Sequence, residues 1–295
     1  VTRAADTTSN ISSLNLIQNA VSVTHEDSGP ITNTNMDTAD NGDAGIRYAV
    51  SGTSLTTDSG MELHVVTQKT YTPGGSITTN ATGGDLHVDD EAAVTIANTS
   101  TINQDVLVDE NATLTINADT AVNGGDITTS GASPTVTTSS GTPTVTMSGT
   151  GSIGGGTSTT LVFHNLNTTG TGTTSLIDNA TVNNDVSVGD GTTLRINANM
   201  TINGGDLTTT STGSIDYTTG SPDVFLNGTG TLGGGSGPIT FEYIRFGDGT
   251  TDTTTLASDV TSTYQLVLNS NQTLSVGTYN VTVGSASVAD SGNLT

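Results

Sequence analysis

The chain has 295 residues, a formal net charge of −23 at pH 7 and no cysteine. Its acidity reflects a shortage of bases, because only 5 Lys and Arg residues stand against 28 Asp and Glu residues. Nucleic acids and anionic membranes are bound by clustered basic residues, so the composition argues against both partners. Without cysteine the chain has no disulfide, thiolate chemistry or zinc–sulfur site. It also lacks an apolar run of about 18 residues, so no transmembrane segment is expected.

The residue composition favours an all-β chain. Hydrophobic residues make up 31% of the sequence, a share low enough that composition alone leaves intrinsic disorder open. However, the sequence contains 63 threonines, and β-branched residues favour strands. Aspartate greatly outnumbers glutamate, as expected where acids lie in turns and not on helices. The choice between disorder and strands therefore depends on residue pattern.

The first segment, residues 1–75, does not share the pattern of the rest of the chain. It contains apolar stretches at 14–23 and 61–67, separated by an Asn, Asp and Gly-rich stretch at 33–45. Repetitive β-folds need a cap over their first open edge, so we expect this segment to be a cap or assembly domain. A weak cluster of oxygen-bearing side chains also lies here: Asp37, Asp40, Asn41 and Asp43.

From residue 76 onward the chain repeats with a period of about 20 residues, which is typical of solenoid proteins. Residues 85–96 align with residues 105–116 at a constant offset of 20, and apolar and polar residues alternate within each repeat. Alternation of this kind indicates strands, and the Gly, Asn and Asp clusters between them indicate turns. Short strands recurring at a fixed spacing predict a parallel β-helix (β-solenoid) over residues 76–295. A β-sandwich array and a flat β-roll are the alternatives.

A second, longer period lies above the first. One copy runs over residues 105–184, the next over 185–264, and a partial copy over 265–295. Each whole copy is expected to contain four coils of about 20 residues, stacked as in other solenoids. Because the chain stops in mid-repeat, we expect the natural array to continue beyond residue 295.

An acidic corner is the main candidate site. Asp89, Asp90 and Glu91 precede Asp109 and Glu110 by about one predicted coil, so stacking would bring these carboxylates together. Neighbouring carboxylates repel one another unless solvent, a proton or a cation intervenes. Oxygen ligands suit calcium, which is the one cofactor the sequence suggests. The alternative is a solvated turn.

Two further motifs have structural explanations. Asn103 and Asn123, like Asn183 and Asn203, recur at the same offset of 20 and predict short asparagine ladders along the coils. The sequence GxGxxG at residues 149–154 and 228–233 is typical of a dinucleotide site only where a helix follows. Here more Gly and Thr follow, so turns or bulges are expected.

Eleven Asn-x-Ser/Thr sequons are candidate glycosylation sites if the protein is secreted. They begin at Asn10, Asn80, Asn98, Asn111, Asn167, Asn179, Asn199, Asn227, Asn271, Asn280 and Asn293.

The stretch VSVGDGTTLRINANMTINGGDLTTTSTGSI, residues 186–215, resembles the repeats of microbial surface proteins. These are the right-handed β-helical adhesins of the filamentous-haemagglutinin and autotransporter-passenger type. The resemblance covers about residues 76–295 and rests on repeat style. It implies a right-handed β-helix, secretion to the cell surface, and adhesion or matrix assembly. It carries over no catalytic residue.

We therefore expect a non-enzymatic extracellular structural protein whose partners are copies of itself in a filament, sheath or surface layer. Head-to-tail contact or strand-edge pairing would join the copies. One alternative is the stalk of a cell-surface adhesin that binds glycans or a host surface through a part outside this chain. Another is a β-helical polysaccharide-degrading enzyme or tailspike. The enzyme is disfavoured because Arg195 and Arg245 have no obvious acidic partner and the histidines are scattered.

Overall fold

The structure is a computed structural model that describes residues 31–33, 55–57, 63–65, 68, 70–247, 249–284, 289–290 and 292–295. These residues form strands and turns and contain no helix. The strands run parallel and recur about every 21 residues, as a right-handed β-solenoid of about 11 turns. The predicted fold class is therefore confirmed. The described residues fall into two units: unit 1 lies within Val1–Pro143 and Gly155–Thr160, and unit 2 lies within Thr144–Gly154 and Leu161–Thr295.

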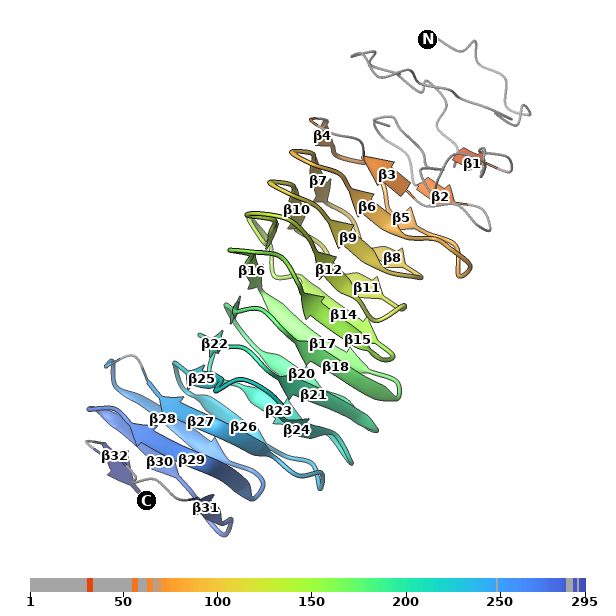
Figure 1. The fold of residues 1–295 in the computed structure, drawn as a ribbon. Helices are drawn as coiled ribbons and strands as arrows, with labels where there is room; N and C mark the ends of the chain where they lie inside the picture. Colours follow the sequence, from red (N-terminus) through yellow and green to blue (C-terminus); the bar gives the residue numbers. More distant parts are fainter. Residues whose placement is uncertain are drawn as a thin grey trace. The chain divides into compact units, whose positions relative to one another are not determined.

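Unit 1 has three parallel sheets, in which each strand pairs with the strand one turn away (Figure 1). The first sheet contains β1 (Ile31–Asn33), β2 (Leu55–Thr57), β5 (Ile77–Thr78), β8 (Ser100–Ile102) and β11 (Thr120–Val122). The second contains β3 (Leu63–Val65), β6 (Leu86–Val88), β9 (Val106–Val108) and β12 (Ile127–Thr129). The third contains β4 (Thr70–Tyr71), β7 (Ala93–Ile96), β10 (Thr113–Ile116) and β13 (Thr135–Thr137).

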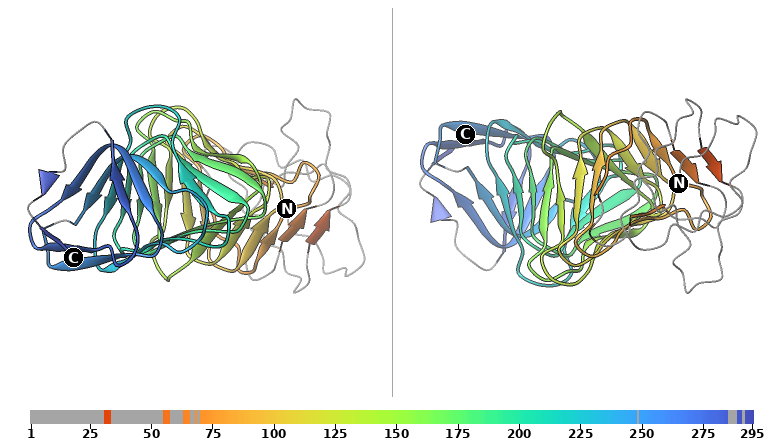
Figure 2. Two further views of the ribbon diagram at one scale, coloured as in Figure 1. Left: turned by 90° about the horizontal axis from the view of Figure 1, so that it is seen from below. Right: turned by 90° about the horizontal axis from the view of Figure 1, so that it is seen from above.

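Unit 2 is built in the same way, and its strands also lie in three parallel rows (Figure 2). One contains β14 (Thr144–Ser148), β17 (Asn165–Thr169), β20 (Val186–Val188), β23 (Leu207–Thr209), β26 (Gly230–Gly233), β28 (Asp252–Leu256), β30 (Gln272–Ser275) and β33 (Asn293–Leu294). The second contains β15 (Gly151–Gly154), β18 (Gly172–Leu176), β21 (Thr192–Ile196) and β24 (Ser214–Asp216). The third contains β16 (Thr160–Phe163), β19 (Ala180–Val182), β22 (Met200–Ile202), β25 (Asp223–Leu226), β27 (Thr240–Phe246), β29 (Val260–Leu268) and β31 (Val281–Val283), and β32 (Ala289–Asp290) also pairs with β29.

Alternation along each strand places the core inside the coil. In β21 the side chains of Leu194 and Ile196 are buried, whereas that of Arg195 points outward. Parallel pairing then aligns buried positions of successive turns, so that each apolar side chain packs on the one above it. One such ladder in unit 2 consists of Leu166, Val186, Leu207, Leu232 and Leu256.

Some positions that the longer sequence period makes equivalent lie on different sheets. Leu194 lies in β21, which pairs with β18 and β24, whereas Leu274 lies in β30, which pairs with β28 and β33. Four turns of about 21 residues are longer than the sequence offset between these two leucines. The expectation of four whole coils per copy is therefore wrong, because the sequence repeats its strand pattern without completing a whole number of turns.

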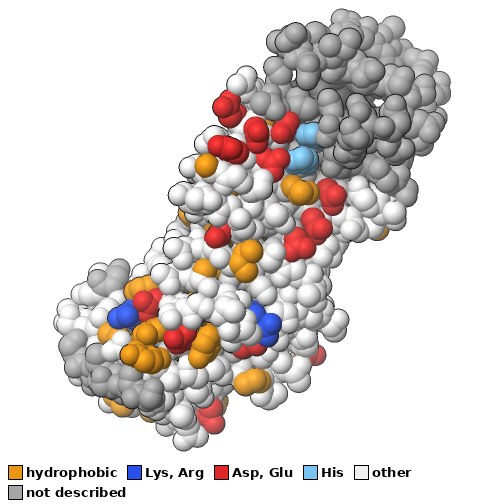
Figure 3. Space-filling view, viewed as in Figure 1, with side chains coloured by type: hydrophobic (Ala, Val, Ile, Leu, Met, Phe, Trp, Pro, Cys, Tyr) orange, Lys and Arg blue, Asp and Glu red, His pale blue; other side chains and the backbone are white. Residues whose placement is uncertain are grey.

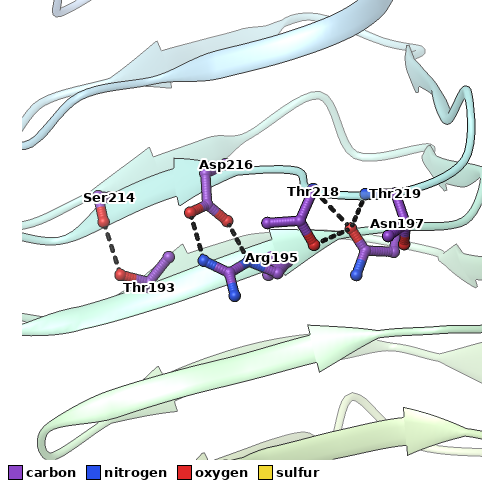
Figure 4. A network of polar contacts seen from close by, with 7 residues as sticks. All are labelled: Thr193, Arg195, Asn197, Ser214, Asp216, Thr218 and Thr219. Atoms are coloured by element: carbon purple, nitrogen blue, oxygen red, sulfur yellow. Dashed lines mark hydrogen bonds and ion pairs between the residues drawn. The ribbon is translucent and has the colours of Figure 1, made fainter.

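Outward side chains link neighbouring turns by polar contacts. Figure 4 shows Arg195 of β21 donating from Nε and Nη2 to the two carboxylate oxygens of Asp216 in β24, at 2.9 and 2.8 Å. Beside this pair, the hydroxyls of Thr193 and Ser214 lie 2.8 Å apart. Arg245 of β27 likewise forms an ion pair with Asp223 of β25. Both arginines thus have acidic partners on the adjacent turn, and the expectation that they lack one is wrong.

Asparagines at turns tie one coil to the next. The Oδ1 atom of Asn197 accepts the backbone N–H groups of Thr218 and Thr219, at 2.8 and 3.2 Å. At the equivalent position of the preceding sequence copy, Oδ1 of Asn117 accepts the backbone N–H groups of Ser139 and Ser140, both at 3.0 Å. The sequence repeat therefore preserves a local turn-capping contact even though its copies do not coincide around the coil.

The predicted asparagine ladders are also confirmed. Nδ2 of Asn123 donates to Oδ1 of Asn103 at 2.7 Å, and Nδ2 of Asn203 donates to Oδ1 of Asn183 at 3.5 Å. Asn227 extends the second ladder by one turn, at 3.1 Å. The GxGxxG stretches lie in turns and in strands β15 and β26, with no helix after them, as expected.

The predicted cap at residues 1–75 lies largely outside the described residues, as does its oxygen cluster at Asp37, Asp40, Asn41 and Asp43. Strands β1 to β4 precede residue 76; β2, β3 and β4 pair in parallel with strands that follow it, and β1 pairs with β2. The parallel pairing therefore reaches into this segment, and the domain boundary and its role as a cap stay predictions.

Replacing Leu194 by Ala should destabilise the fold, because the Leu194 side chain is fully buried and its removal leaves a cavity in the core. We expect a loss of about 2 to 5 kcal/mol in the free energy of unfolding, measured by urea denaturation. Thr193→Ala, one residue away on the outer face, should cost no more than about 1.5 kcal/mol. Equal losses in the two variants would contradict this orientation of β21.

Candidate functional site

The acidic corner lies where β6 and β9 end in unit 1. The backbone N–H of Asp89 donates to the carbonyl of Val65, and that of Asp109 donates to the carbonyl of Val88. These bonds place Asp89 and Asp109, the first residues of their turns, next to the ends of the strands one coil earlier. The short sequence repeat predicts this stacking. Asp89, Asp90 and Asp109 consequently bring carboxylate oxygens within 4.8 Å of one another.

Two histidines join this corner, and the sequence reasoning missed them. His64 is the central residue of β3 and His87 is the central residue of β6, and the strand register pairs them directly. Their rings stack with centroids 4.4 Å apart and planes 11° apart. The signal was present in the sequence, because Leu-His-Val occurs at 63–65 and again at 86–88. A histidine between two buried residues of a strand points away from the core.

The histidines contact the corner carboxylates. Nε2 of His87 lies 2.6 Å from Oδ2 of Asp109, and Nε2 of His64 lies 3.5 Å from Oδ2 of Asp89. The hydroxyl of Ser130, one turn further on, donates to Oδ1 of Asp109 at 2.5 Å. Figure 3 shows pale-blue histidine side chains beside red acidic ones on the surface of the protein. We call His64, His87, Asp89, Asp90 and Asp109 the histidine–aspartate corner.

The two predicted glutamates lie outside this group. Glu91 is exposed and takes a left-handed backbone conformation with φ of 58°, and Nε2 of Gln68 donates to its carboxylate at 2.7 Å. Glu110 is exposed as well. Of the five acids predicted as calcium ligands, the structure thus groups three, and calcium binding stays a prediction. The corner as a whole offers both ring nitrogens and carboxylate oxygens.

A second group of acids forms a column along unit 1. Oδ1 of Asp85 accepts the backbone N–H of Asp105 at 3.0 Å, and Oδ1 of Asp105 accepts that of Asp126 at 3.3 Å. Burial raises the pKa of the Asp105 carboxyl above 3.8, the Asp126 hydrogen bond lowers it, and the charges of Asp126 and Asp85 raise it further. In unit 2, burial and the charge of Asp206 raise the pKa of Asp185 in the same way. The carboxylates of Asp85 and Asp105 each cap a backbone N–H of the next turn.

An aromatic cluster forms a third feature, on the outer face of β25, β27 and β29 in unit 2. The rings of Tyr243 and Tyr264 lie 4.8 Å apart at 51°, and the guanidinium of Arg245 lies 5.7 Å from the centre of the Phe225 ring. Beside Phe225 the surface is hollowed, and the hollow is lined by Thr201, Phe225, Asn227, Gly247, Gly249, Asn269 and Ser270. We call Phe225, Tyr243, Arg245 and Tyr264 the aromatic cluster.

Ten of the eleven predicted sequons start within the described residues, and Asn10 lies outside them. Six of these asparagines are exposed: Asn111, Asn179, Asn199, Asn271, Asn280 and Asn293. The other four are half-buried: Asn80, Asn98, Asn167 and Asn227. Their glycosylation stays a prediction.

Comparison with protein-family models, with curated proteins and with solved structures found no match for this chain. Within the part of the chain that the structure describes, no helix has the length and apolar character needed to cross a membrane.

Asp105→Asn should stabilise the protein at neutral pH. A carboxyl whose pKa is raised by folding binds its proton more tightly in the folded state, so its ionised form opposes folding above that pKa. The amide keeps the Oδ1 acceptor and removes the charge. We expect a small rise in Tm at pH 7, because solvent screens the charge of this partly exposed carboxylate. The difference should vanish as pH falls through the raised pKa to about 3.

Asp190→Asn is the matched control, and it should change Tm in the opposite direction. Hydrogen bonds from the hydroxyl and backbone N–H of Thr212 lower the pKa of Asp190, so its ionised form favours folding. Its replacement should lower Tm at pH 7, and this loss should also disappear in acid. A Tm for Asp105→Asn below that of the parent protein at neutral pH would contradict the assignment.

Proposed function

We propose that this chain is a non-catalytic structural protein of the cell exterior, a protomer that assembles with copies of itself into a filament, sheath or surface layer. One observation carries the proposal: in the described turns, most side chains that make contacts pack against or hydrogen-bond to the neighbouring turn. Apolar residues stack inside, and Asn, Asp, Ser and Thr side chains bond from coil to coil outside. Side chains that stabilise the stack of turns are typical of a structural protein.

The arginines support the structural role. Arg195 and Arg245 are the arginines of the described residues, and each is held by an aspartate on the adjacent turn. Such two-point pairs fix the orientation of the guanidinium and occupy its donors. A polysaccharide-degrading enzyme would instead need acid and base groups poised toward a substrate. The pairing of Arg195 and Arg245 with aspartates on the adjacent coil therefore favours a stabilising role for these arginines over a catalytic one.

Self-association is supported by the backbone chemistry of the coils. Parallel turns pair through N–H and C=O groups that every turn presents, and the residue pattern of 105–184 recurs over 185–264. A strand of a second copy can therefore pair as a strand of the same chain does. The net charge of −23 opposes close approach of copies, and dissolved salt screens this repulsion.

Assembly of the purified chain should therefore increase with protein concentration and ionic strength. Electron microscopy should show filaments or layers, and light scattering should report growing mass as salt is added. Diffraction from the assembled material should show the strand spacing of about 4.8 Å. Monodisperse monomers at every concentration and salt condition would overturn the proposal.

Attachment to glycans, in the manner of a cell-surface adhesin, is a second candidate that the aromatic cluster favours. Tyrosine rings present an apolar face to sugar C–H groups and a hydroxyl to their polar edges. Tyr264 is 44% exposed, and the hollow beside Phe225 adds the amides of Asn227 and Asn269. Figure 3 shows hydrophobic and charged side chains gathered on the surface of this part of the chain.

Glycan attachment is tested by affinity electrophoresis in gels that contain neutral or acidic polysaccharides. Tyr264→Ala should weaken retardation about tenfold, because a stacked ring contributes about 1.4 kcal/mol. Tyr279→Ala removes a ring that is similarly exposed, at 40%, and is not part of the aromatic cluster. Equal retardation of the parent protein and both variants, or no retardation at all, would exclude this candidate.

A further inference from the structure

The histidine–aspartate corner has the ligand chemistry of a transition-metal site. We propose that a ring nitrogen from each of His64 and His87 and a carboxylate oxygen of Asp89 bind a divalent metal ion of the zinc type. Asp109 acts through His87, as a positioning residue. The inference does not depend on the proposed function, because an ion here would join two turns of unit 1 whatever the protein does.

The strand register brings the three ligands together. His64 and His87 occupy paired positions of β3 and β6, and Asp89 follows β6 directly, so backbone pairing sets their relative positions. One ligand atom from each of the three residues lies within 4.8 Å of the other two. Bonds of about 2.0 to 2.2 Å to zinc place ligand atoms roughly 3.3 Å apart in a tetrahedron. Modest side-chain rotations would therefore close the site.

The ligand types favour zinc over calcium. Calcium takes six to eight oxygen ligands, whereas imidazole suits zinc, nickel, cobalt and copper. His64 is only 4% exposed, and His87 and Asp89 are mostly buried, with side chains 21% and 26% exposed. The pre-formed ring stack at 4.4 Å lowers the conformational cost of binding. The two imidazoles of the corner are thus the feature that favours a zinc-type ion over calcium.

The surrounding groups strengthen the site. Asp109 holds Nε2 of His87 at 2.6 Å and is itself held by the hydroxyl of Ser130. Carboxylates that fix ligating histidines in this way raise metal affinity. Asp89, Asp90 and Asp109 also place negative charge in a small volume, which a divalent cation offsets. The bound ion would link β3 to the turn that follows β6.

The full chain, first treated with a chelator and then freed of it, is titrated separately with Zn²⁺, Ni²⁺, Ca²⁺ and Mg²⁺ in a calorimeter. We expect one Zn²⁺ per chain with a Kd of about 10 µM or lower, weaker or comparable Ni²⁺ binding, and no Ca²⁺ or Mg²⁺ binding to these ligands. Tm should rise with free Zn²⁺ because the ion binds the folded state. Nuclear magnetic resonance should show the imidazole signals of His64 and His87 shifting in step with the titration.

The variants separate the corner from other histidines and acids. His87→Gln and Asp89→Asn should abolish Zn²⁺ binding, and Asp109→Asn should weaken it about 10- to 100-fold. His164→Gln and Glu110→Gln, which remove one histidine and one acid outside the corner, should leave binding unchanged. Circular dichroism checks that each variant keeps its strand signal. If His87→Gln fails to fold, Asp89→Asn and the imidazole shifts of the parent protein decide the question.

Several results would overturn the proposal. One is the absence of Zn²⁺ and Ni²⁺ binding to the parent protein. Another is Zn²⁺ binding that survives His87→Gln or Asp89→Asn, or that His164→Gln removes. Calcium binding that persists in His87→Gln would assign the corner to an oxygen-only site instead.

Discussion

The fold depends on contact between one turn of the chain and the next. A turn of about 21 residues is too short to enclose its own apolar side chains, so residues such as Leu194 become buried only when another turn lies against them. Backbone hydrogen bonds between parallel strands set the distance and register of this contact. Burial and pairing are thus the same event, and each turn is stable only as part of a stack. This dependence explains how a chain with so little hydrophobic content folds without cysteine.

The same register determines the surface chemistry. Residues one turn apart in sequence become neighbours, so the outer face consists of short columns: Asn103 with Asn123, Asp105 with Asp85, and Arg195 with Asp216. These columns link one turn to the next. The histidine–aspartate corner differs because stacked imidazoles meet carboxylates at the point where strands give way to a turn. The aromatic cluster differs because rings gather on a face that elsewhere carries mainly small polar side chains. Both features arise from register, and neither is contiguous in sequence.

Sequence reasoning succeeded where the physical signal is local and periodic. Alternation within strands and a constant offset of 20 predicted the coils, the asparagine ladders and the grouping of Asp89 with Asp109. It failed where turn length varies, because Arg195 meets Asp216 only after a turn of 21 residues and His64 meets His87 after one of 23. A fixed spacing of 20 places neither pair together. The longer sequence period misled for a related reason, since equality of residue pattern does not imply an equal position around the coil.

Stacking of successive turns holds together a threonine-rich chain whose composition alone would leave it open to disorder. Hydrogen–deuterium exchange of the full chain in native buffer, read by mass spectrometry of overlapping peptides, tests this most directly. Amides that bond between turns, such as those of Val186, Asn197 and Asn203, should be strongly protected. Protection should extend over consecutive strands of unit 2, because each turn stabilises its neighbours. Rapid exchange across β17 to β26 would contradict the account.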